Sequence, residues 1–173
     1  DLLTLKRTPD RQSETLRYDA FTVEATAGEK KTCYCKALIF RMLQVLSQEW
    51  KDDTVRVHEL SSVQTGWNTP DILKGFKEIF GPAAVKVTIA EGSAPNPHLG
   101  LRDSWFLLTF RSGKTIAIRA SGKLYTERYF KLRGALQRGE KELYISDALR
   151  EREQLGKRFR EIPLNLMFTV QRK

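Results

Sequence analysis

This sequence has no long hydrophobic run and few cysteines or histidines, the residues that form disulfides and metal sites. Its 173 residues include two cysteines, two histidines and two methionines. No apolar run reaches the roughly 18 residues that a membrane-spanning helix requires, and no signal peptide is visible. The chain begins at Asp1 rather than Met, which is compatible with removal of a leader or a disordered head. The sequence therefore predicts no membrane span and assigns no compartment.

Motifs for nucleotides, acyl transfer and nucleic acids are also missing. No Walker loop, GxGxxG or GxSxG occurs. The run FRSGKT (residues 110–115) resembles half a phosphate loop, but it lacks the earlier glycine and lies in a predicted hairpin. No RNP1-type, zinc-finger or KH-type signature is present, so nucleic-acid binding is not indicated.

The composition is that of a folded domain with an excess of positive charge. Hydrophobic residues make up 40% and charged residues 29%, which is enough for a core in a single domain. The net charge is +9 and the isoelectric point is about 9.7. A basic balance favours an acidic partner protein, nucleic acid or an anionic lipid surface, whereas the alternative is a purely solubilising role.

Hydrophobic periodicity predicts a mixture of strands and helices. Residues 1–17 are expected to form a polar N-terminal arm, and residues 26–32 and 91–103 to form loops. The predicted strands cover residues 18–25, 54–60 and 84–90 and a β-hairpin over 104–120. The tail at 164–170 is expected either to add a strand or to dock in the core. The predicted helices cover residues 33–50, 70–80, 123–139 and a charged segment at 147–161. Since the spacing is not that of regular βαβ units, we expect one α+β domain over residues 18–173, with helices packed on an antiparallel sheet.

The two cysteines lie at the start of the predicted buried helix, where Thr32 is the expected N-cap. The helix dipole and free N–H groups there favour a thiolate at Cys33 or Cys35. Residues two apart on a helix point about 200° apart, which argues against a chelate. Two reduced thiols are favoured over a small strained disulfide ring. A Cys33–His98 or Cys35–His58 dyad and a Cys₂His₂ zinc site are the alternatives, although the spacing fits no standard zinc pattern.

A small polar loop between a predicted strand and the helix at 70–80 carries an exposed-looking tryptophan, Trp67. The ring of Trp67 would stack a flat ligand, with Thr65, Asn68 and the free N–H groups of the next helix as hydrogen-bonding partners. The alternative is that Trp67 covers the core. For the helix itself, Thr69 is the expected N-cap and Gly81 the expected stop.

The order of four motifs resembles the FmdE-like family of formylmethanofuran dehydrogenase proteins. GEKKTCYCKALIF (28–40) stands where that family has a His/Cys loop entering a buried helix. QTGWNT (64–69) stands at its TGCT-like loop, FLLTFRSGKTIAIR (106–119) at its hairpin, and RYFKLRGAL (128–136) at its F-x-L-R helix. The resemblance covers residues 24–139.

This resemblance implies an α+β fold, often dimeric, and a metal site formed by the helix start and the TGCT-like loop. Family members accompany molybdenum or tungsten dehydrogenases as accessories. The expected histidines are replaced here by residues 29–31, and the expected loop cysteine by Trp67. Cys33 and Cys35 are then the only candidate ligands left, for a thiophilic metal such as zinc or for a Cys-bound cofactor.

Three functions follow as expectations. The first is a non-catalytic accessory module that binds a small ligand, cofactor or metal in a pocket lined by Cys33, Cys35, Thr65, Gly66, Trp67, Asn68 and Lys114. The second is a basic interaction protein that docks on an acidic partner or nucleic acid through Arg150, Arg152, Lys157, Arg158 and Arg160. The third is a cysteine-dependent enzyme, for which the sequence places no convincing base.

Overall fold

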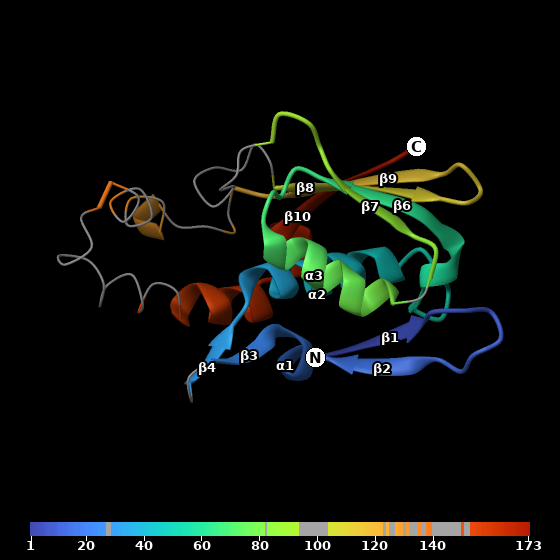
Figure 1. Cartoon of the computed structure of the whole chain (residues 1–173), viewed down its shortest axis with the longest axis horizontal. Coiled ribbons are helices and arrows are strands. Elements are labelled where there is room, and N and C mark those ends of the chain that lie inside the picture. Colours follow the sequence, from blue (N-terminus) through green and yellow to red (C-terminus); the bar gives the residue numbers. More distant parts are fainter. Residues whose placement is uncertain are drawn as a thin grey trace.

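A computed structural model of the chain confirms the expected α+β class, with helices packed on mainly antiparallel sheets. It describes residues 1–26, 29–81, 83–93, 104–122, 124, 127–129, 131, 135, 138–139, 150 and 153–173. Figure 1 shows the long helices lying between a larger sheet and a smaller one.

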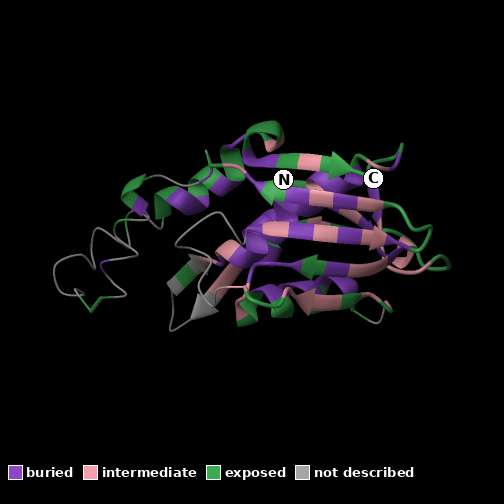
Figure 2. Ribbon diagram, turned by 90° about the horizontal axis from the view of Figure 1, so that it is seen from above, coloured by how far each residue is buried: buried purple, intermediate pink, exposed green. Residues whose placement is uncertain are grey.

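The larger sheet has five strands in the order β10-β9-β8-β6-β7. Only the β6–β7 pair is parallel. Figure 2 shows buried and less buried residues alternating along its strands, as expected for a sheet with one face on the core. The predicted hairpin is confirmed as β8 and β9, with Gly113 at φ 92 in its turn. The strands are β6 (Leu60–Thr65), β7 (Lys86–Ile89), β8 (Trp105–Phe110), β9 (Thr115–Ala120) and β10 (Phe168–Arg172).

The smaller sheet has the order β2-β1-β5 and lies on the other side of the helices (Figure 1). The segment predicted as a polar arm forms its first two strands, and Leu3 and Leu5 enter the core. A separate two-stranded ribbon, β3 with β4, leads into the first long helix. These strands are β1 (Leu2–Lys6), β2 (Glu14–Arg17), β3 (Val23–Thr26), β4 (Glu29–Thr32) and β5 (Thr54–Arg56).

Two long helices fill the space between the sheets. The first, α2 (Tyr34–Ser47), buries almost every residue, as its broad apolar stripe predicts. The second, α3 (Pro70–Phe80), packs against α2 along one apolar face. Gly75 makes this approach close, because a Cβ built there would lie 2.7 Å from Ile39 Cδ1. The shorter helices are α1 (Tyr18–Thr22), η1 (Val57–Glu59) and α6 (Leu164–Met167).

The ends of α3 confirm the sequence prediction. The Thr69 hydroxyl accepts the Ile72 N–H at 3.3 Å, and Gly81 closes the helix at φ 51. The Arg7 guanidinium also donates to the carbonyls of Glu78 and Ile79 in the last turn. The arm segment therefore caps a helix that lies more than 70 residues further along the chain.

Two predictions near the start of the chain are wrong. The predicted strand at 18–25 begins as α1, because Tyr18, Phe21 and Thr22 share one side of a helical turn and are all buried. The predicted loop at 26–32 contains β4, which pairs with β3. Thr32 is consequently a strand residue, and Cys33 takes the N-cap position of α2.

The predicted strand at 54–60 is also wrong in its bounds. It divides into β5, η1 and the first residue of β6, which runs on to Thr65. The polar residues of β6 lie in a strand that pairs with β8. The Ser61 hydroxyl also donates to the Thr109 carbonyl at 3.0 Å. The loop before α3 thus shrinks to residues 66–69.

The strand at 84–90 is confirmed as β7. The tail at 164–170 divides into α6 and the start of β10, so it both adds a strand and buries Met167 and Phe168 in the core. The predicted loop at 91–103 and helices at 123–139 and 147–161 lie partly outside the described residues, although 153–161 is helical. Within the described ranges, no helix combines the length and apolar character needed to cross a bilayer.

Candidate functional site

The start of α2 is held by backbone hydrogen bonds from both sides. The Cys33 N–H donates to the Thr22 carbonyl at the end of α1, at 2.7 Å, and the Ala37 N–H donates to the Cys33 carbonyl at 2.9 Å. Cys33 itself is extended, with φ −80 and ψ 114. The first cysteine is therefore fixed just outside the helix and the second just inside it.

Both cysteines lie at the start of α2, but only Cys35 is helical. The expected angle of about 200° applies only when both residues are helical, and Cys33 is not. The pKa of each thiol is shifted by the other. Both residues are buried free cysteines, with 7% and 4% exposure. The angle used in the argument against a chelate therefore does not apply to this pair, and the argument itself stays untested.

Trp67 lies against this pair and is fully buried, so the expectation of an exposed ring is wrong. Its indole Nε1–H donates to Cys35 Sγ at 3.2 Å. The Thr69 hydroxyl lies 3.1 Å from the same sulfur. Sequence reasoning assigned Thr69 only to the N-cap of α3 and missed this second contact. The loop before α3 and the start of α2 thus meet at Cys35 Sγ.

The neighbours of Trp67 hold the loop in place. The Thr65 hydroxyl donates to the Trp105 carbonyl at 2.7 Å and accepts the Trp67 N–H at 3.0 Å. The Gly66 N–H also donates to the Trp105 carbonyl, at 3.3 Å, and the Asn68 side chain donates to the Ser93 carbonyl at 3.4 Å. The polar residues of this loop therefore attach it to β8 and to the segment after β7.

Lys114, the remaining predicted site residue, lies elsewhere. Its Nζ pairs with Glu49 at 2.5 Å and sits over the Phe110 ring. Glu49 follows the C-terminal end of α2, whereas Cys35 is in its first turn. At 1.5 Å per residue, the helix separates them by about 20 Å. Lys114 is therefore not part of the cysteine site.

The hydrogen bond between the thiols moves their pKa values in opposite directions. Acceptance of the Cys35 S–H lowers the pKa of Cys33 to about 7, with burial opposing this and the backbone N–H of Lys36 adding to it. The same bond, which keeps Cys35 protonated, raises the pKa of Cys35, and burial raises it further. The pair is thus poised to carry one thiolate and one thiol above neutral pH.

A thiolate titration tests this arrangement. We expect the ultraviolet absorbance of one thiolate per chain to rise with a midpoint near pH 7, because Cys33 ionises above that pH and is protonated below it. Cys35→Ala removes the donor and should move the midpoint up toward the ordinary value for cysteine. Cys35→Ser, which keeps a hydroxyl donor, is the matched control with a smaller shift. Equal midpoints in the two variants would contradict the role of the hydrogen bond.

The histidine alternatives are not assembled by the described residues. His58 Nδ1 lies 3.4 Å from the Lys6 carbonyl in the smaller sheet. The next residue, Glu59, accepts from Trp50 Nε1 just beyond the C-terminal end of α2, so His58 is at the opposite end from Cys35. His98 lies outside the described residues. No cluster of three or more His, Cys, Asp or Glu side chains suited to a metal occurs in the described part of the chain.

A buried lysine next to the pair was not anticipated from the sequence. Lys36, 7% exposed, pairs with Glu78 at 2.9 Å and with Glu24 at 3.4 Å. Burial alone would lower the pKa of Lys36, but these carboxylates raise it. Lys36 therefore stays charged and links α2 to α3 and β3. The only sign of this role in the sequence is a lysine among the apolar residues of the predicted helix.

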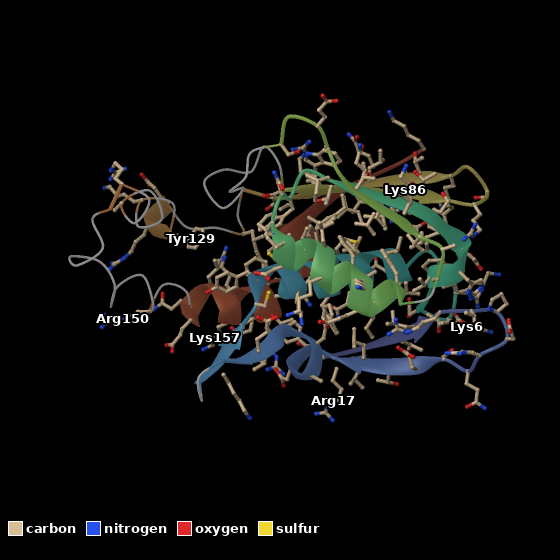
Figure 3. The ribbon with its side chains drawn as sticks, viewed as in Figure 1. Lys6, Arg17, Lys86, Tyr129, Arg150 and Lys157 are labelled. Carbon is tan, nitrogen blue, oxygen red and sulfur yellow. The ribbon has the colours of Figure 1, made fainter. Side chains whose placement is uncertain are left out.

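The four described basic residues of the interaction hypothesis are all exposed, and two of them, Arg158 and Arg160, also hold contacts within the chain. Arg158 Nε donates to the Leu124 carbonyl at 3.0 Å, and Arg160 pairs with Asp1 and Asp19. Arg150 and Lys157 are exposed, and Arg152 lies outside the described residues. Figure 3 shows labelled basic side chains on well separated parts of the molecule: Lys6, Arg17, Lys86, Arg150 and Lys157.

Comparison with models of protein families, with curated proteins and with solved structures finds no match to this chain.

Proposed function

We propose that this chain is a non-catalytic accessory module that binds a thiophilic metal ion through Cys33 and Cys35. The supporting observation is that two buried thiols lie at the start of α2, with the Trp67 indole N–H and the Thr69 hydroxyl in contact with the sulfur of Cys35. An FmdE-like module, which the motif order resembles, would hold its metal between the same two segments.

The chemistry of the cluster supports soft-metal binding. Thiolate sulfur is the ligand that soft ions such as Cu(I) and Zn(II) select. The helix dipole at the start of α2 favours the anionic sulfur of Cys33. The Trp67 indole N–H donates to Cys35 Sγ and the Thr69 hydroxyl shares a hydrogen bond with it, as outer groups do around metal ligands. Cys35 lies in the first turn of α2, and Cys33 is the single residue between β4 and α2, which favours a preorganised site.

The non-catalytic part of the proposal rests on the surroundings of the thiols. Nucleophilic cysteine catalysis needs a base within hydrogen-bonding reach of the sulfur. The side chains with a hydrogen bond to Cys35 Sγ are those of Trp67 and Thr69, and neither an indole nor a hydroxyl is a base of the required strength. His58 is at the far end of α2. These contacts favour ligation over proton transfer.

Metal analysis of the reduced protein tests the proposal. We expect elemental analysis and native mass spectrometry to find one thiophilic metal ion per chain after reconstitution, and none in the Cys33→Ser/Cys35→Ser double variant. His58→Ala, which changes a potential ligand remote from the pair, is the matched control and should retain the ion. Equal metal content in the double variant, or no uptake by the native chain, would overturn the proposal.

A further inference from the structure

The larger sheet has α2 and α3 on one face only (Figure 1). The pairing register shows which side chains share its other face, because residues paired across two strands point to the same side of a sheet. Gln64 of β6 pairs with Leu107 of β8, and Leu107 pairs with Ala117 of β9. None of these three is buried, whereas the next residues on β8 and β9, Leu108 and Ile118, belong to the core. This second face, here called the open face, thus carries partly or fully exposed side chains from neighbouring strands.

The charged residues that the strands place on the open face are both basic. All five strands lie within the described residues, and they contain no aspartate or glutamate. Lys86 of β7 pairs with Ser62, Arg119 of β9 pairs with Trp105, and both basic residues are exposed. At about 4.8 Å between strands, three strand spacings separate β7 from β9 by roughly 14 Å. An extended polyanion that crosses the strands can therefore contact both residues, and the net charge of +9 attracts it.

The open face also carries an aromatic ring next to one of its two charges. Trp105 is the first residue of β8, and it is half-buried, whereas the next residue, Phe106, is buried in the core. Arg119 lies directly opposite Trp105 in the register. An indole ring on a sheet surface stacks an unpaired base of any sequence, and a neighbouring guanidinium adds to the attraction.

Most of the remaining side chains on the open face are hydroxyls and amides rather than charges. They include Ser62, Gln64, Thr109, Thr115 and Gln171. Such groups donate and accept hydrogen bonds, as the edges of unpaired bases require. An acidic peptide would use the two basic residues but not the ring or the amides, and a second copy of the chain would bring positive charge against positive charge. Because the residues come from separate strands, no linear motif could show this surface.

From the register, the charge and the exposed ring, we infer that the open face of the larger sheet binds single-stranded nucleic acid. Trp105 stacks a base, Lys86 and Arg119 contact phosphates, and the amides and hydroxyls between them contact base edges. The inference does not depend on the proposed metal-binding function, because Cys33 and Cys35 lie on α2, on the other side of the sheet.

Fluorescence anisotropy of labelled oligonucleotides tests the inference on the full chain. The probes are single-stranded RNA and DNA of mixed sequence, about 10 nucleotides long, and the duplex of the same sequence. We expect a single strand to bind at least about 10-fold more tightly than the duplex, and Trp105→Leu to weaken this binding by about 5–100-fold. Lys86→Gln/Arg119→Gln should weaken it and lower the slope of log affinity against log salt by about 1–2.

A matched pair of basic residues separates the open face from net charge alone. Lys6→Gln/Arg17→Gln removes the same charge from the smaller sheet (Figure 3), and it should leave affinity and salt slope nearly unchanged. An equal loss in both double variants would reduce the effect to net charge and overturn the inference. Equal binding of the duplex or of polyglutamate, binding only to anionic phospholipid vesicles, or no binding at low salt would also overturn it. Unchanged affinity in Trp105→Leu, with its fold checked by circular dichroism, would refute stacking on the sheet.

Discussion

Trp67→Ala is expected to lower the free energy of unfolding by about 3–5 kcal/mol, the range for truncating a large buried aromatic side chain. Trp67 is the largest of the fully buried side chains, with 0% exposure. The substitution leaves a cavity where the loop before α3 meets α2, and it removes the indole donor to Cys35 Sγ. Urea unfolding followed by circular dichroism measures the loss directly.

Two further substitutions separate burial from hydrogen bonding. Trp67→Phe fills most of the space and should lose clearly less stability than the alanine variant. Trp105→Ala truncates a tryptophan that is only half-buried at the start of β8, so its cost should also be smaller. If Trp67→Ala unfolded at the same urea concentration as the native chain, the ring would not be part of the core.

Gly75→Val is expected to lower the free energy of unfolding by about 2–3 kcal/mol. The first carbon of any side chain at this position would lie 2.7 Å from Ile39 Cδ1 and 3.4 Å from Lys36 Cγ. Ile39 is fully buried, so it has no space into which to retreat. The valine would therefore push α3 away from α2 and loosen the packing behind the cysteine pair. Thermal and urea unfolding measure the effect.

Lys77→Val is the matched control for this substitution. It places the same side chain in the same helix on an exposed position, where the cost is limited to helix propensity, below about 1 kcal/mol. Similar losses in the two variants would mean that the helix propensity of valine, and not the close approach of α2 and α3, sets the cost.

The parts of the fold that the sequence predicts well are those with strong local signals. The Thr69 cap with Pro70 fixes the start of α3, and the turn around Gly113 fixes the hairpin. The failures come from segments whose pattern is set by distant partners. Residues 60–65 form strand β6 although several of them are polar, because they pair with β8. No local feature of these residues predicts that pairing.

The site shows the same division. Local reasoning placed Cys33 and Cys35 at a helix start, and the motif order placed the loop of Trp67 beside them. It could not predict that Cys33 stays outside the helix, because that depends on its extended backbone, which the hydrogen bond to Thr22 fixes. It also placed Lys114 in the site, since a sequence does not show that the hairpin turn lies at the far end of α2.

The contact between Trp67 and Cys35 gives the chain a built-in optical reporter. A thiol sulfur beside an excited indole quenches its fluorescence by electron transfer, and here the ring and the sulfur are joined by an N–H···S bond of 3.2 Å. With Trp50 and Trp105 replaced by Phe, only Trp67 would emit. Its emission would change whenever the Cys35 sulfur loses its proton, is alkylated or binds a metal ion. The state of a buried cysteine can thus be followed in real time without a dye.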